Sequence, residues 1–203
     1  LRDRRGAGVV VTGDQRLGLG LAAGGGVGLV AAAVLLVERF RLADDPAYIP
    51  SCSVNPVLSC GSIMESWQAA LLGFPNPVIG VAAFPVVITT GMALLSGAVL
   101  ARWFWQGLQV GVLTGLALVG WLVFQSLYRI GALCPYCMVV WAVVWPIAWY
   151  VTLRNLRSGA LGRWGAESPV VARAQEWHGL VTLLPYAAVM VAVLVRFWSF
   201  WTG

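Results

Sequence analysis

Five long, mostly apolar runs dominate this chain of 203 residues, and four of them contain no charged residue at all. A helix needs about 20 consecutive apolar residues to cross a bilayer, and each run is close to that length. Charged residues make up only 10% of the chain, whereas soluble domains contain roughly 25%. Arg196 lies near the end of the fifth run, from where a long side chain can reach the membrane interface. The sequence therefore predicts an all-α integral membrane protein with five transmembrane helices, at 17–37, 78–100, 107–128, 131–153 and 180–200.

The basic residues are distributed unevenly between the two sides of the predicted membrane. All 13 are arginines, and cytoplasmic loops are enriched in positive charge. With the N-terminus in the cytoplasm, nine arginines fall on the cytoplasmic side and three on the other, and Arg196 lies within the fifth span and is not assigned to either side. We therefore expect a multi-pass protein of the cell inner (cytoplasmic) membrane. Its expected parts are a cytoplasmic tail at 1–16, a four-helix bundle at 17–153 with an extracytoplasmic cysteine loop at 38–77, an arginine-rich cytoplasmic loop at 154–179 and a fifth transmembrane helix at 180–203.

Several classes of activity are excluded by what the sequence lacks. There is no lysine, and the one histidine, His178, is too few for a histidine-ligated metal site or a histidine proton relay. Neither a P-loop motif nor the G-x-S-x-G motif of many hydrolases occurs. The arginines are not interleaved with aromatic residues, so we expect no binding of nucleic acid.

The four cysteines all fall on the predicted extracytoplasmic side. Cys52 and Cys60 lie in the first outer loop, and Cys134 and Cys137 form a C-P-Y-C motif at the outer end of the fourth span. An even number of cysteines in an oxidising compartment suggests disulfides. Four cysteines allow three pairings, and the residues alone do not rank them.

The C-x-x-C motif is the most chemically distinctive part of the chain. Unpaired backbone N–H groups at the start of a helix stabilise a thiolate and lower its pKa. Pro135 suits a first helical turn, and Gly131 allows a tight turn before it. A redox-active disulfide is the favoured interpretation, with a static disulfide and half of a zinc site as alternatives. The wide spacing of Cys52 and Cys60 fits zinc poorly, so we expect no metal.

The residues after the first cysteine pair carry the pattern of a short helix. Ser62 and Glu65 match a capping box, and apolar residues recur at helical spacing as far as Gly73. The pattern predicts an amphipathic helix on the outer membrane surface that covers the bundle and tethers the cysteine loop. Glu65 is interpreted as a cap of this helix rather than as an acid catalyst.

Glycines repeat at a spacing of four in two of the predicted spans. They are Gly20, Gly24 and Gly28 in the first span, and Gly111 and Gly115 in the third. This spacing predicts close approach of neighbouring helices.

Two cysteine pairs on one side of a membrane can pass electrons by thiol–disulfide exchange. An exposed pair can meet a protein partner, and a pair at the mouth of a bundle can meet a hydrophobic oxidant. Such an oxidant enters from lipid, and a quinone is the natural candidate. The competing hypothesis is a non-enzymatic membrane scaffold with two structural disulfides.

Three segments resemble the vitamin K epoxide reductase family, in the same order along the chain. They are C-S-V-N-P-V-L-S-C-G-S at 52–62, N-P-V-I-G at 76–80 and C-P-Y-C at 134–137. The resemblance extends from the first predicted span to the end of the fourth, and it is to the bacterial branch. It implies a four-helix bundle around a quinone site with one peripheral helix. It also implies a thiol:quinone oxidoreductase that reoxidises a secreted, disulfide-forming partner with a thioredoxin fold.

The resemblance implies a role for each cysteine. Cys52 would exchange with the partner, Cys60 would attack Cys134, and Cys137 would face the quinone, either menaquinone or ubiquinone. Many bacterial members carry a fused thioredoxin-like domain, whereas this chain stops at Gly203. We therefore expect the partner to be a separate, DsbA-like protein.

Three further residues are candidates for contact with the quinone. Asn76 matches a family asparagine proposed to hydrogen-bond a quinone oxygen, and Ser66 matches a family serine between the loop helix and the bundle. Trp141 stands where animal members have a tyrosine, and its indole offers only an N–H donor. Without the resemblance, Asn76 is typical of a turn and Ser66 of a polar helix position. Trp141 is then typical of a packing stripe with Trp145 and Trp149.

Overall fold

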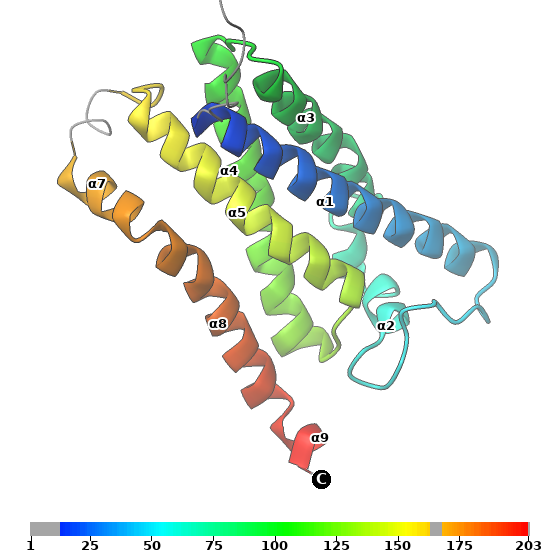
Figure 1. The fold of residues 1–203 in the computed structure, drawn as a ribbon. Helices are drawn as coiled ribbons and strands as arrows, with labels where there is room; N and C mark the ends of the chain where they lie inside the picture. Colours follow the sequence, from blue (N-terminus) through cyan, green and yellow to red (C-terminus); the bar gives the residue numbers. More distant parts are fainter. Residues whose placement is uncertain (1–12, 163–167, 203) are drawn as a thin grey trace, which may run out of the picture.

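The computed structural model describes residues 13–162 and 168–202, and its regular elements there are helices (Figure 1). In chain order they are α1 (Gly13–Asp44), α2 (Cys60–Met64), η1 (Trp67–Ala70), α3 (Pro77–Leu95), α4 (Arg102–Gln125), η2 (Ser126–Ile130), α5 (Pro135–Arg157), α7 (Pro169–Glu176), α8 (His178–Arg196) and α9 (Trp198–Thr202). η1 is a 3-10 helix and η2 is a π-helical turn that continues α4. Residues 1–12 of the predicted tail and Arg163 of the predicted cytoplasmic loop lie outside the described residues.

Five of the described helices are long and apolar enough to cross a membrane: α1, α3, α4 continued by η2, α5 and α8. The predicted all-helical membrane fold with five such helices is therefore confirmed. Their ends differ from the predicted spans, because a helix does not stop where charged residues begin. α1 continues to Asp44, well beyond the first charged residue after its apolar run. α5 begins later than predicted, because Gly131 has a left-handed φ of 74° and ends the preceding π turn.

α1 and α3 cross at glycines that bring the two backbones into contact. A Cβ atom on Gly18 would lie 2.8 Å from the carbonyl oxygen of Gly91, and a Cβ on Gly91 would lie 2.6 Å from that of Gly18. Close approach is confirmed at Gly28, which lies under a phenylalanine ring of α3. It is wrong for Gly20, which faces open space, and Gly24 makes only ordinary contact. The spacing of four identified the right helix and one contact position, Gly28, but missed the crossing at Gly18.

Four helices, α1, α3, α4 and α5, enclose one apolar core, and α8 lies outside it along α5 (Figure 1). No described residue of α8 is buried. α8 is tied to α5 by polar contacts, among them a hydrogen bond from the Trp145 indole N–H to the Thr182 carbonyl (3.1 Å). At its far end, Arg196 Nε donates to the carbonyl oxygen of Leu127 in η2 (2.8 Å). The fifth helix is thus peripheral to a four-helix bundle, as predicted.

The segment between α1 and α3 lies at the same end of the bundle as the start of α5 (Figure 1). It contains two short helices, α2 and η1, in place of the single helix predicted as far as Gly73. The backbone of Ser66 is extended, with φ −73° and ψ 148°, and it separates the two. Ser59 rather than Ser62 caps α2, because its Oγ accepts a hydrogen bond from the Ser62 N–H (3.3 Å). Glu65 occupies the C-cap position, so the predicted capping box is wrong.

Candidate functional site

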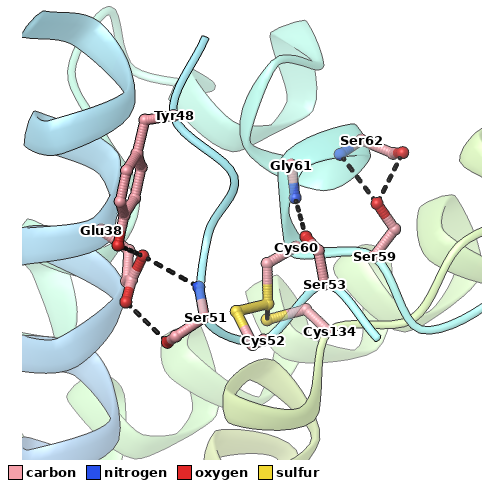
Figure 2. The surroundings of a disulfide bond; sticks show 10 residues. All are labelled: Glu38, Tyr48, Ser51, Cys52, Ser53, Ser59, Cys60, Gly61, Ser62 and Cys134. Carbon is pink, nitrogen blue, oxygen red and sulfur yellow. Dashed lines mark hydrogen bonds between the residues drawn. A yellow bond between two sulfur atoms is a disulfide. The ribbon is translucent and has the colours of Figure 1, made fainter. Parts of the chain in front are cut away.

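Three of the four cysteine sulfurs meet at one end of the bundle (Figure 2). Cys52 and Cys60 form a disulfide, and Cys134 is a free thiol. The Cys134 sulfur lies 3.0 Å from that of Cys60, and all three sulfurs lie within 4.8 Å of one another. Two of these sulfurs are bonded to each other and so offer no thiolate to a metal ion. The arrangement suits thiol–disulfide exchange rather than zinc binding.

A short backbone pairing holds the loop disulfide beside the C-x-x-C motif. Leu58 and Leu133 form a parallel bridge. The Leu133 N–H donates to the carbonyl of Val57 (2.7 Å), and the Ser59 N–H donates to the carbonyl of Leu133 (3.0 Å). The pairing ends directly before Cys60 in one segment and directly before Cys134 in the other. It therefore sets the distance between the sulfurs of Cys60 and Cys134.

A buried carboxylate near the end of α1 fixes the backbone next to Cys52 (Figure 2). Glu38 accepts hydrogen bonds from the Tyr48 hydroxyl (2.9 Å), the Ser51 hydroxyl (2.7 Å) and the Ser51 N–H (3.3 Å). Only 5% of Glu38 is exposed. In the sequence, Glu38 is only the first charged residue after the apolar run at 17–37, so this role was not predicted. Nothing in the spacing to Ser51 marks the two as partners.

The C-x-x-C motif lies at the start of α5, where sequence analysis placed it. Cys134 is the N-cap residue and Pro135 is the first helical residue. The pKa of Cys134 is lowered from its usual value because its thiolate accepts hydrogen bonds from the Cys137 thiol and from the backbone N–H groups of Cys137 and Tyr136. These hydrogen bonds outweigh the burial of Cys134, which acts in the opposite direction. The local geometry therefore favours a reactive Cys134 thiolate.

Cys137 lines a cavity of about 550 Å³ inside the bundle, with walls from α1, α3, α4 and α5. The lining is mostly apolar, and both the size and the lining are typical of small-molecule sites. Gly111 and Gly115 line it from α4, and a Cβ atom on either would meet no atom within 4 Å. The prediction that these two glycines bring helices together is therefore wrong. Their missing side chains instead leave the cavity open.

Asn76 and Ser66 both line this cavity. The Asn76 side chain donates from Nδ2 to the Gln68 carbonyl (2.7 Å) and accepts at Oδ1 from the Leu71 N–H (3.2 Å). The Ser66 hydroxyl donates to the carbonyl of Ile63 (2.6 Å). The bonds of Asn76 hold η1 and the residue after it against the start of α3, and the bond of Ser66 ties the start of η1 to α2. An amide group has two N–H bonds, and the bond to Gln68 occupies only one of those of Asn76.

Trp141 also lines the cavity, while another side of it packs in a small apolar cluster of Val57, Leu127, Leu133 and Phe197. The candidate residues thus divide into two groups. Cys52, Cys60 and Cys134 form the sulfur cluster, and Cys137, Ser66, Asn76 and Trp141 line the cavity.

Two buried polar residues of the cavity wall, Gln68 and Ser126, were not predicted. Ser126 begins the π turn η2, for which the sequence carries no recognisable signal. Gln68 lies in η1, within a segment that was expected to be one regular helix.

A comparison with protein families identifies the chain. The model of the vitamin K epoxide reductase family matches residues 19–152, about two thirds of the sequence. The chain belongs to the vitamin K epoxide reductase family. No match is found among curated proteins. Membership in this family indicates a membrane oxidoreductase that acts through thiols and disulfides, and the matched residues contain all four cysteines.

Proposed function

We propose that this member of the vitamin K epoxide reductase family is a thiol:quinone oxidoreductase that reoxidises a separate, DsbA-like protein with a thioredoxin fold. The observation that carries the proposal is the position of the C-x-x-C motif. Its first sulfur, on Cys134, lies 3.0 Å from the loop disulfide. Its second cysteine, Cys137, lines the apolar cavity. The motif can therefore exchange electrons with the disulfide on one side and with a hydrophobic acceptor on the other.

The first exchange takes electrons from the partner. A thiolate of the reduced partner attacks Cys52, and Cys60 leaves as a thiolate. The partner's second thiol then attacks the mixed disulfide, so that the partner is oxidised by two electrons and the loop pair is reduced. Ile49 and Val54 flank Cys52 and are 74% and 72% exposed, which gives a partner an apolar surface next to the entry sulfur.

The second exchange moves the electrons to the C-x-x-C motif. The Cys60 thiolate attacks Cys134 of the Cys134–Cys137 disulfide, and Cys137 leaves. Cys52 then attacks Cys60, which re-forms the loop disulfide and releases Cys134. The lowered pKa of Cys134 makes it a good leaving group. The product has a Cys52–Cys60 disulfide and two thiols in the motif, which is the redox state of this structure.

The cavity residues fit a quinone, which accepts two electrons and two protons and leaves as a quinol. Asn76 has an N–H bond beyond the one given to Gln68, and the Trp141 indole N–H is a second donor for a quinone carbonyl. The Ser66 hydroxyl already donates its proton, so it acts as an acceptor for a quinol hydroxyl. Menaquinone and ubiquinone both have such carbonyl groups, which become hydroxyls in the quinol, so the same residues suit either quinone.

We also propose that the sulfur cluster faces the extracytoplasmic side of the inner membrane, with the N-terminus in the cytoplasm. The arginine distribution and the disulfide support this orientation. The tail at 1–16 and the loop at 154–179 are then cytoplasmic. The bundle at 17–153, with its loop at 38–77, carries the reaction, and the segment 180–203 forms the fifth span.

The test is quinone reduction by the purified chain in detergent. A reduced thioredoxin-fold partner is added, and the absorbance of the quinone is followed for the native chain, for Cys137→Ala and for Met138→Ala. Met138 is the next residue and is 38% exposed, so it serves as the matched control. We expect reduction by the native chain and the control but not by Cys137→Ala. Turnover by Cys137→Ala would contradict the assigned role, and no turnover by the native chain would favour the scaffold with structural disulfides.

A further inference from the structure

A second cavity, of about 790 Å³, lies at the end of the bundle opposite the sulfur cluster. Its walls come from the first turns of α1, the last turns of α5 and the start of α8. A hydrogen bond between the Tyr150 hydroxyl and His178 Nδ1 (3.1 Å) joins α5 to α8 at this cavity. The residues proposed to act in the redox reaction do not line it.

The polar rim of this cavity is strongly basic. Three arginines, Arg16, Arg154 and Arg157, line it, with Asp14 as the one acidic residue among the lining residues. Arg154 Nε lies 3.8 Å from Asp14 Oδ1, and the Arg154 guanidinium stacks over the Trp105 ring at 3.5 Å. Arg16 and Arg157 are exposed and have no acidic partner among the described residues. Three positive charges against one negative charge leave an excess of two, which suits an anion.

The inner part of the cavity is apolar and extends into the membrane-spanning part of the bundle. Leu17, Gly20, Leu21 and Gly24 line it from α1, and Pro146 and Ile147 line it from α5. A Cβ atom on Gly20 would meet no atom within 4 Å, so the helix surface there is open. From Arg16 to Gly24 the helix rises about 12 Å into the membrane. The first part of an acyl chain that starts at the basic rim runs in the same direction and reaches a similar depth.

We propose that this cavity binds an anionic phospholipid. Its phosphate is held by Arg16 and Arg157, and one acyl chain lies against the glycine face of α1 and the Pro146 region of α5. Guanidinium groups form strong charge-assisted hydrogen bonds with phosphate, and basic pockets between membrane helices are known lipid headgroup sites. Such a lipid fills the space between α1, α5 and α8, and it holds against the bundle a helix that has no buried residue of its own. The proposal is independent of the redox reaction.

The test uses the full chain in detergent, with equal amounts of phosphatidylglycerol and phosphatidylcholine. Native mass spectrometry measures the bound lipids for the native chain, for the double variant R16Q/R157Q and for R129Q/R173Q. The last variant also removes two exposed arginines, and neither lines the cavity. We expect the native chain and the control to prefer phosphatidylglycerol. In R16Q/R157Q this preference should fall about 25-fold, because each of the two arginines contributes roughly a factor of five.

Thermal unfolding gives a second readout that separates lipid binding from folding. Without added lipid, R16Q/R157Q and the native chain should unfold at similar temperatures, and phosphatidylglycerol should raise the unfolding temperature of the native chain alone. Equal binding of the two lipids by the native chain would overturn the proposal. So would equal losses in the two double variants. Stabilisation by inorganic phosphate as large as that by the lipid would identify a free-anion site instead.

Discussion

The Cys134 sulfur lies 3.0 Å from the Cys60 sulfur, although 74 residues separate the two cysteines in sequence. The bridge between Leu58 and Leu133 produces this proximity, because it pairs the backbones directly before the two cysteines. The distance is therefore a property of the backbone and does not depend on a bond between the sulfurs. This arrangement makes a mixed disulfide between loop and helix accessible without movement of the bundle.

We predict that Cys60 and Cys134 form a disulfide readily once their alternatives are removed. In Cys52→Ala/Cys137→Ala, mild oxidation should link Cys60 to Cys134 in nearly all molecules, as measured by peptide mapping. The control is Cys52→Ala/Cys134→Ala, which leaves Cys60 with Cys137. Cys137 is outside the cluster of three sulfurs that lie within 4.8 Å, so this variant should cross-link much more slowly. Equal rates in the two variants would contradict the arrangement of the sulfurs.

The lowered pKa of Cys134 predicts how its reactivity depends on pH. Its thiolate is present above the lowered pKa and is lost as pH falls through it, so attack on Cys60 should persist at lower pH than for an ordinary cysteine. The largest cause of the lowered pKa is the hydrogen bond that the Cys137 thiol donates to Cys134. A serine hydroxyl at position 137 can donate this hydrogen bond instead, whereas an alanine cannot. The exchange rate in Cys137→Ala should therefore fall off at higher pH than in Cys137→Ser.

The measurement is a pH jump followed by acid quenching and peptide mapping of the Cys60–Cys134 and Cys52–Cys60 disulfides. Both variants keep the three sulfurs of the cluster, so any difference between them comes from position 137. Identical pH profiles in the two variants would show that the side chain of Cys137 does not lower the pKa of Cys134.

Glu38 is predicted to position the entry disulfide. Glu38→Ala removes the acceptor for Tyr48 and for both donors of Ser51, and hydrogen bonds to a charged group contribute about 1.5–3 kcal/mol each. With the backbone next to Cys52 released, turnover with the partner should fall roughly 10- to 100-fold. The control is Asp44→Asn, an exposed carboxylate on the same helix. Stopped-flow assays of partner oxidation check this, and native turnover in Glu38→Ala would remove Glu38 from the site.

The sequence was sufficient for features that depend on local composition or on a single helix end. Apolar run length predicted the five helices, and Pro135 indicated a first helical turn within the C-x-x-C motif, which is where α5 begins. Features that depend on how two distant segments meet could not be predicted. The Leu58–Leu133 bridge and the burial of Glu38 depend on the packing of the loop against the bundle.

The glycine and helix patterns failed for related physical reasons. A spacing of four places glycines on one face of a helix, but it does not say whether that face meets another helix. Gly20 and Gly111 therefore matched the pattern without making close contacts. The helix predicted after Cys60 breaks at Ser66 because its hydroxyl and its extended backbone favour a turn over a continuous helix. Periodicity alone does not report such competition between local hydrogen bonds.

The open face of α4 gives the most direct test of the cavity. Gly111→Leu adds a side chain where a Cβ meets no atom within 4 Å, so the bundle should still fold while the cavity loses volume. We expect the KM for quinone to rise about tenfold or more, while thiol exchange between Cys60 and Cys134 stays at the native rate. Gly120→Leu is the matched control, because Gly120 lies on the same helix, has equally open surroundings and does not line the cavity. Steady-state assays over a range of quinone concentrations distinguish the two variants. A similar KM in Gly111→Leu and Gly120→Leu would place the quinone outside this cavity.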